Sequence, residues 1–157
     1  MLKACVKQWD KNKGRLEQVF RRVSGWNNCT YRQLVEVLVR FVLNDNDQYD
    51  WEGWDYTRIT EIDNGGYCGT LIYLIPANDS EPSEYDYLMT YVRYGSCSGC
   101  DSLKRIQEAA ADDTLLLTET QVKDMMTLCK DLLTNMIKPY NGGWRHDEEY
   151  EEVREDV

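Results

Sequence analysis

The spacing of apolar residues changes twice along the chain, and this change constrains the fold more than any other feature of the sequence. Apolar residues recur every three or four positions in residues 14–23, 30–44, 101–110 and 118–138, which is typical of amphipathic helices. Residues 57–96 instead contain three runs rich in Tyr, Ile, Val and Thr, which is typical of β-strands. This order predicts an α+β fold, α-α-β-β-β-α-α, in which a three-stranded antiparallel sheet packs against helices.

Short polar motifs mark the ends of several of these elements. Thr30 with Gln33, and Thr118 with Gln121, have the spacing of a capping box at the start of a helix. The dipeptide at residues 64–65, Asn-Gly, predicts the turn of a β-hairpin, because both residues tolerate positive φ. The local signals therefore agree with the order of elements that the apolar spacing predicts.

The charge of the chain is unevenly distributed. The sequence carries a net charge of −10, yet residues 1–40 contain nine basic and three acidic residues, so the remainder carries −16. This asymmetry indicates a polar interaction surface or an acidic tail, although solubility and internal charge pairing would also explain it. We predict one α+β domain over residues 1–145, followed by an acidic C-terminal tail over residues 146–157. The sequence makes no prediction of oligomeric state.

Hydropathy argues against a membrane protein or a secreted protein. No apolar run approaches the roughly 20 residues that a membrane helix needs. The N-terminal stretch lacks the apolar region of a signal peptide, so we expect the chain to reside in the cytoplasm. Six structural disulfide partners are not expected there, because cytosolic thiols are kept reduced.

The stretch RYGSCSGCDSLKR, residues 93–105, places two cysteines between the third predicted strand and a helix. A thiolate at a helix start is favoured by free N–H groups and the helix dipole, which would suit thiol–disulfide exchange by Cys97 and Cys100. The preceding hairpins and the absence of proline between the cysteines speak against a thioredoxin-like unit. A structural zinc site is the other chemical alternative, with Cys68 as the best third ligand for the pair.

The same stretch can also be a tight turn without chemistry. Gly95, Ser96, Ser98 and Gly99 are small residues that permit a sharp strand-to-helix connection. Asp101 or Ser98 would then cap the following helix. Under this interpretation no cofactor is expected, and zinc remains the alternative.

Catalytic signatures are scarce. The only histidine, His146, lies in the acidic tail, which removes cysteine–histidine pairs and HExxH zinc motifs from consideration. The sequence contains neither a phosphate-binding GxxxxGK[ST] loop nor GxGxxG. Hydrolysis by two carboxylates stays open, because acidic residues are plentiful. The sequence therefore favours a binding protein over an enzyme.

An acidic, aromatic segment within residues 44–57 is the candidate binding site. Tyrosine and tryptophan are efficient interface anchors, and carboxylates beside them would steer a basic partner. The candidate residues are Tyr49, Asp50, Trp51, Glu52, Trp54, Asp55 and Tyr56. In the opposite interpretation, Trp51 and Trp54 cover the sheet and the acids are merely exposed. Direct binding of nucleic acid is not favoured, because the chain as a whole is acidic.

The segment YGSCSGCD resembles a motif of small bacteriophage and prophage accessory proteins. The match covers Tyr94, Gly95, Ser96, Cys97, Ser98, Gly99, Cys100 and Asp101. The resemblance implies a small accessory protein that acts on a macromolecule of the host cell or of the phage. Together with the acidic composition, it predicts an anti-CRISPR-like inhibitor that occupies the basic surface of a nucleic-acid-binding defence protein, for example a CRISPR nuclease. The alternative prediction is a cysteine-dependent protein that uses Cys97 and Cys100 for structural zinc or thiol–disulfide exchange.

Overall fold

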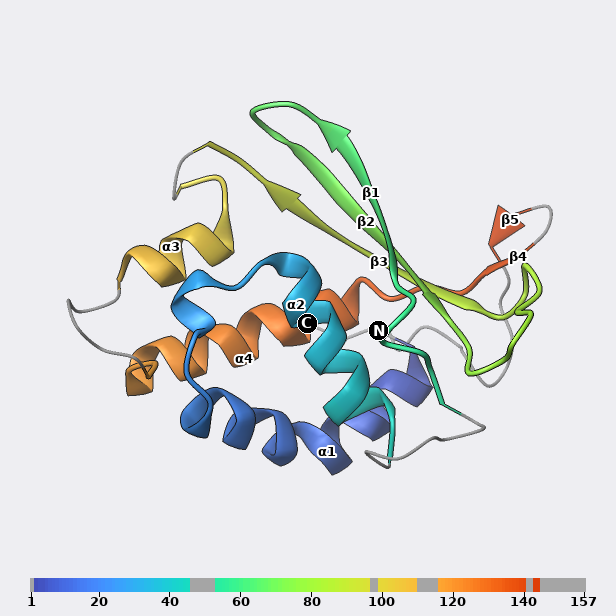
Figure 1. Cartoon of the computed structure of the whole chain (residues 1–157), viewed down its shortest axis with the longest axis horizontal. Coiled ribbons are helices and arrows are strands. Elements are labelled where there is room, and N and C mark those ends of the chain that lie inside the picture. The colour runs from blue at the N-terminus through green and yellow to red at the C-terminus, as the bar shows by residue number, and fades with distance from the viewer. Residues whose placement is uncertain (1, 46–52, 97–98, 110–115, 141–142, 145–157) are drawn as a thin grey trace.

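The computed structural model of the chain describes residues 2–45, 53–96, 99–109, 116–140 and 143–144. Its elements, in chain order, are α1 (Lys3–Arg22), the 3-10 turn η1 (Trp26–Asn28), α2 (Tyr31–Leu38), the π-helix η2 (Val39–Leu43), β1 (Thr60–Gly65), β2 (Gly69–Pro76), β3 (Tyr87–Tyr94), α3 (Ser102–Glu108), α4 (Glu119–Thr134), β4 (Pro139–Tyr140) and β5 (Gly143–Trp144). The predicted α+β fold is confirmed, and the helices lie together on one side of the three-stranded sheet (Figure 1). The short β4–β5 hairpin was not predicted.

The first helix is about twice as long as the sequence predicted. It begins at Lys3, whereas the apolar spacing predicted a helix only from residue 14. Its buried face runs through Cys5, Trp9, Asn12, Leu16 and Phe20. Asn12 interrupts the apolar pattern, and its Nδ2 donates a hydrogen bond of 2.8 Å to the backbone oxygen of Val42. The helix can bury this amide because the amide is hydrogen-bonded.

Both predicted capping boxes are confirmed. The Thr30 hydroxyl accepts a hydrogen bond from the Gln33 N–H, and the Gln33 side chain accepts one from the Thr30 N–H at 2.9 Å. Thr118 and Gln121 form the same pair of bonds at the start of α4. These bonds fix the first turns of α2 and α4, where backbone N–H groups have no partner within the helix.

The β1–β2 hairpin is confirmed, but the predicted position of its turn is wrong. Asn64 and Gly65 belong to β1 and pair with Thr70 and Gly69 of β2, so the turn is formed by residues 66–68. A Cβ atom on Gly65 would lie 2.5 Å from the backbone oxygen of Cys68. The ladder includes the Asn-Gly dipeptide because the pair of Gly65 and Gly69 allows the two backbones to approach closely.

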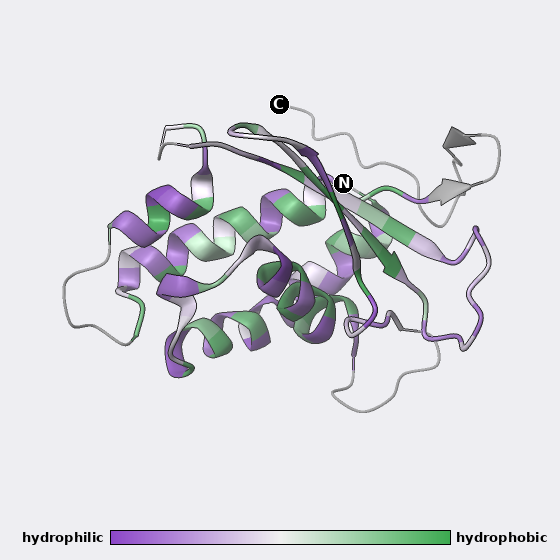
Figure 2. Ribbon diagram, turned by 45° about the horizontal axis from the view of Figure 1, so that its top comes forward, coloured by the Kyte–Doolittle hydropathy of each residue, from purple (hydrophilic) through white to green (hydrophobic). Residues whose placement is uncertain are grey.

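The two faces of the sheet have different surroundings. Tyr73 of β2 and Thr90 of β3 are adjacent in the sheet and fully buried, and the Thr90 hydroxyl donates to the backbone oxygen of Leu132 in α4. On the opposite face, Ile62 and Tyr91 remain 44% and 39% exposed. Figure 2 shows the helices beneath the first of these faces. The sheet therefore buries one face against the helices and leaves the other open to solvent.

The buried side chains of α1, α2, the sheet, α3 and α4 form one hydrophobic core. After α4, Ile137 exchanges two backbone hydrogen bonds with Met89 of β3, so the chain returns to the β3 edge of the sheet. Within the described residues, every helix is too short or too polar to cross a membrane. The acidic tail predicted for residues 146–157 lies outside the described residues.

Candidate functional site

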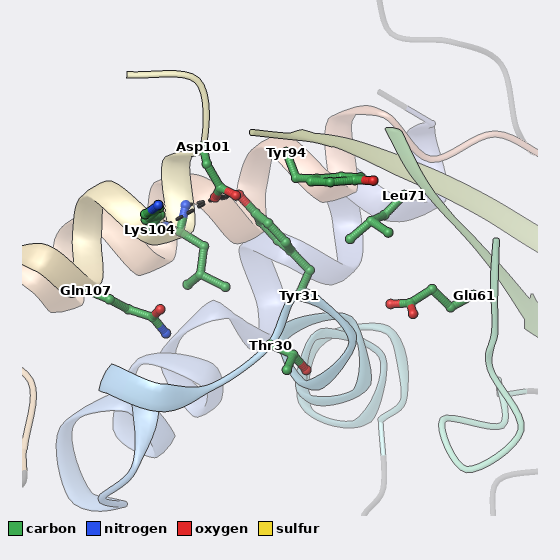
Figure 3. A pocket seen from close by; sticks show the side chains of 9 residues that line it. Thr30, Tyr31, Glu61, Leu71, Tyr94, Asp101, Lys104 and Gln107 are labelled. Atoms are coloured by element: carbon green, nitrogen blue, oxygen red, sulfur yellow. Dashed lines mark hydrogen bonds between the residues drawn. The ribbon is translucent and has the colours of Figure 1, made fainter. Parts of the chain in front are cut away.

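A cleft of about 350 Å³ lies where the β1–β2 hairpin approaches the starts of α2 and α3 (Figure 3). The residues that line it include Tyr31, Glu61, Leu71, Tyr94, Asp101 and Lys104. Figure 3 shows the side chain of Glu61 directed toward Tyr31. Asp63 lies two residues beyond Glu61 on β1 and therefore shares its face of the sheet. Glu61 and Asp101 thus line the cleft, and Asp63 is hydrogen-bonded to the lining residue Tyr94.

Asp101 connects the cysteine-containing turn to α3. One of its carboxylate oxygens accepts the N–H of Lys104 at 3.1 Å, which caps the helix as the sequence predicted. The other oxygen accepts the N–H of Gly95 at 3.3 Å. A single side chain therefore closes the loop from residue 95 to residue 101 and starts the helix.

Tyr31 at the start of α2 completes the network around Asp101. Its hydroxyl donates to the Asp101 carboxylate and accepts the buried N–H of Leu103 at 3.0 Å. Burial raises the pKa of the Tyr31 phenol, and the adjacent Asp101 carboxylate raises it further. The phenol therefore stays neutral and works as a fixed donor to the carboxylate.

Two further tyrosines hold the carboxylates of β1. The Tyr73 hydroxyl donates to Glu61 at 2.7 Å, and the Tyr94 hydroxyl donates to Asp63 at 2.5 Å. Burial raises the pKa of Tyr73, and the hydrogen bond to Glu61 raises it further by a smaller amount. The hydrogen bond to Asp63 raises the pKa of Tyr94 to about 12. Each of the three carboxylates is therefore positioned by a neutral hydroxyl rather than by a cation.

Two cations near this site, Lys104 and Arg32, bind other groups. Lys104 Nζ donates to the backbone oxygen of Ser96 at 2.6 Å. Arg32 donates to the backbone oxygen of Ile59, and its Nε lies 3.7 Å from Glu36. In the part of the chain that the structure describes, Glu61, Asp63 and Asp101 form no ion pair. Their negative charge is thus available to a cationic ligand or partner.

The structure describes only part of the predicted acidic, aromatic segment, and that part lies away from the cleft. Tyr49, Asp50, Trp51 and Glu52 lie outside the described residues. The backbone of Trp54 is held by the Asn44 side chain, and its indole packs against the core. Asp55 pairs with Arg58 at 2.6 Å, and Arg40 lies over the Tyr56 ring. The described half of this segment covers the core and pairs its charge internally.

The cysteines fall into two groups. Cys5, Cys29 and Cys129 are buried free thiols, and burial raises the pKa of Cys5 to about 12 and that of Cys29 to about 11. Cys68 is an exposed free thiol at the hairpin turn. Cys100 is exposed and disulfide-bonded. Among the described cysteines, the sulfur atoms that solvent can reach therefore lie at the hairpin turn and at the strand-to-helix turn, and not in the core.

The positions of Cys97 and Ser98 lie outside the described residues, so the complete turn is not described. Ser96 and Gly99 are placed in the turn, and a Cβ atom on Gly95 would lie 2.8 Å from the Cys100 sulfur. Among the described residues, no group of three or more potential metal ligands was found, and Cys68 joins no such group. A sulfur bonded in a disulfide is also no thiolate ligand for zinc while that bond persists.

Sequence reasoning missed most of the residues that form the cleft. Tyr31, Glu61 and Asp63 were not candidates, although Glu61 and Asp63 alternate along a predicted strand and so had to share one face. Asp101 was expected as a helix cap, and Tyr94 and Asp101 were named only as parts of the YGSCSGCD motif. No family model, no curated protein and no solved structure matches this chain. The resemblance to phage accessory proteins therefore stays a prediction.

Proposed function

We propose that this chain is an acidic binding protein that engages the basic surface of a nucleic-acid-binding partner. One observation carries the proposal: Glu61 and Asp101 in the cleft, and Asp63 beside it, are positioned by tyrosine hydroxyls and form no ion pair among the described residues. A partner that binds nucleic acid presents Lys and Arg at phosphate spacing. Carboxylates held in place would meet these cations at little cost in side-chain entropy.

The negative charge of the site has the same sign as the net charge of the whole chain. The net charge of −10 adds a long-range attraction for a basic protein, which raises the association rate at low salt. Hydroxyl donors leave the remaining carboxylate lone pairs open to further donors, so Arg and Lys can bind without displacing the tyrosines. The chain would compete with nucleic acid because both bind the same cations.

The finer form of this proposal is an anti-CRISPR-like inhibitor in the host cytoplasm. It is supported by the resemblance of residues 94–101 to phage accessory proteins, together with the acidic composition. In this form, the partner is a host defence protein, for example a CRISPR nuclease, and the purified chain reduces its binding to target DNA. The inhibition requires no catalytic step, because occupying the basic surface is sufficient.

The test is affinity capture from lysate of a bacterial host, with and without nuclease treatment. We expect a nucleic-acid-binding protein to be captured after nuclease treatment and to be released by an added oligonucleotide. Asp63→Lys should abolish capture. Glu84→Lys makes the same charge change in the β2–β3 turn at the other end of the sheet and should preserve it. Equal capture by both variants would refute the role of the carboxylates.

A cysteine-dependent function is the second candidate, because the exposed Cys100 is in a disulfide while Cys68 offers an exposed thiol at the neighbouring hairpin turn. An exposed disulfide that exchanges with small thiols has a reduction potential above that of a structural disulfide. Equilibration with glutathione buffers, followed by mass spectrometry of the alkylated protein, measures this potential. Reduction near the glutathione potential supports exchange. Zinc retained in native mass spectra of the reduced protein supports the zinc version.

A further inference from the structure

The strand β1 is an open edge of the sheet. Among the described strands, the order β1-β2-β3 gives β1 a partner on one side only (Figure 1). All six of its residues, Thr60–Gly65, are exposed. The other edge is partly covered, because Ile137 exchanges backbone hydrogen bonds with Met89 and the Asn135 side chain donates to the backbone oxygen of Tyr91. Within the described residues, β1 is thus the edge whose outward backbone groups have no partner.

The side chains of β1 select what can pair with it. Natural edge strands are protected by Lys, Pro, bulges or inward-pointing charges, and β1 carries only the last of these, Glu61 and Asp63. Two copies of β1 side by side would bring these carboxylates together, so the edge disfavours pairing with itself. A strand with Lys or Arg opposite the carboxylates would instead form cross-strand pairs of opposite charge.

The register of the sheet defines the pattern of such a strand. Residues that pair directly across two strands share a face, so side chains opposite Glu61 and Asp63 would lie on the face that leads to the cleft. The residue of the added strand that lies between these two side chains would be on the open face, beside Ile62. Ile62, Ile72 and Tyr91 form an apolar row across the three strands on that face. An alternation of basic and apolar residues therefore fits both faces at once.

We propose that β1 accepts an extended, cationic segment of the partner by strand addition, with Lys or Arg at alternate positions facing Glu61, Asp63 and the cleft, and apolar residues between them extending the row of Ile62. Backbone hydrogen bonds along β1 supply affinity, and the alternating side chains supply specificity. This inference rests on the proposed function and specifies how the basic partner is recognised.

Synthetic peptides test the inference without knowledge of the partner. The probe is Lys-Val-Lys-Val-Lys-Val, which matches the six residues of β1, and its control is the block isomer Lys-Lys-Lys-Val-Val-Val. Two further versions of the probe carry N-methyl groups at the odd or at the even positions. Because successive N–H groups of a strand point to opposite edges, only one of these two sets of amides would face β1.

We expect the alternating peptide to bind and the block isomer to bind at least about tenfold more weakly. One N-methylated version should lose binding while the other keeps it. Amide hydrogen exchange within Thr60–Gly65 should be fast at alternate residues in the free protein and slower with the probe bound. Asp63→Lys should weaken binding of the alternating peptide, and Glu84→Lys should leave it within about twofold because it lies at the far end of the sheet.

Other outcomes would overturn the inference in distinguishable ways. Equal binding of the alternating and block peptides, without protection of β1 amides, would overturn strand addition and leave an acidic binding surface. Amides of β1 already protected in the free protein would show that the edge is occupied. If neither peptide binds but Asp63→Lys still abolishes capture from lysate, strand addition is wrong and the proposed function stands. If neither peptide binds and Asp63→Lys does not reduce capture, both strand addition and the proposed function are wrong.

Discussion

Replacing Tyr31 with phenylalanine tests whether the network around Asp101 holds the cleft together. The substitution keeps the ring, which is buried at the start of α2, and removes only the hydroxyl. That hydroxyl donates to Asp101 and accepts the N–H of Leu103 at 3.0 Å. Tyr31→Phe therefore leaves the buried N–H of Leu103 without its acceptor.

The two lost bonds differ in cost. Asp101 keeps the amide donors of Lys104 and Gly95, so losing the hydroxyl costs it little. Among the described residues, the Leu103 N–H has no second acceptor, and an orphaned buried donor costs about 1–3 kcal/mol. We expect Tyr31→Phe to lower the free energy of unfolding by about 2 kcal/mol. For a chain of this length, that corresponds to a fall in Tm of about 4–8 °C.

Urea denaturation followed by circular dichroism measures this loss, with an unchanged m-value as the sign that the native state is intact. Tyr94→Phe is the matched control, because its hydroxyl also donates to a carboxylate, Asp63, but at an exposed position. Water can replace that hydroxyl, so Tyr94→Phe should be much less destabilising. If Tyr31→Phe destabilises the protein no more than Tyr94→Phe, the buried amide is not the reason that Tyr31 is a tyrosine.

Two further predictions concern the turn and the phenols. Gly95→Ala should destabilise the protein by about 1–3 kcal/mol in the same urea assay, because the new Cβ would lie 2.7 Å from the Cys100 Cβ; unchanged stability would show that the turn shifts freely. Stability should also fall above about pH 10, because phenols ionise there in the unfolded chain while the pKa values of Tyr31, Tyr73 and Tyr94 are raised in the folded protein. The wild-type protein should therefore lose stability with rising pH more steeply than Tyr31→Phe does. Parallel stability curves for the two proteins would contradict this prediction.

Local patterns predicted the elements of the fold because each pattern acts over a few residues. The capping boxes at Thr30 and Thr118 form within one helical turn, and the three strands follow their β-branched and aromatic content. The start of α1 was missed because Asn12 breaks the apolar stripe with a buried amide. Its acceptor is the backbone oxygen of Val42, 30 residues away, which no local pattern contains.

The cleft could not be predicted because its contacts join distant parts of the chain. Tyr31 and Asp101 are separated by 70 residues, and Asp63 and Tyr94 by 31 residues. Only the sheet register and the contact between the starts of α2 and α3 bring these groups together. The acidic, aromatic segment attracted attention because its residues are adjacent in sequence, yet Asp55 is neutralised by its own neighbour Arg58. The sequence shows that the chain is acidic, but only the contacts in the folded structure show which carboxylates are free of ion pairs and can bind a cation.

The substitution Asp101→Asn separates the two roles that Asp101 has in this structure, as a helix cap and as a charge of the site. Asparagine caps helices as well as aspartate does, so Asp101→Asn keeps the bond from the Lys104 N–H. Its amide nitrogen then faces the N–H of Gly95 and loses that bond, at a cost of about 1 kcal/mol.

Removing the charge of Asp101 should also weaken binding of the peptide Lys-Val-Lys-Val-Lys-Val by about threefold to tenfold at low salt. Asp124→Asn removes the same charge from an exposed position on α4 and should leave binding nearly unchanged, which titration of the fluorescently labelled peptide would measure for both variants. If Asp101→Asn binds as tightly as Asp124→Asn while losing stability, then Asp101 acts only on the turn. The carboxylates of β1 would then form the binding surface without Asp101, because a charge that belongs to the site has to change its affinity when it is removed.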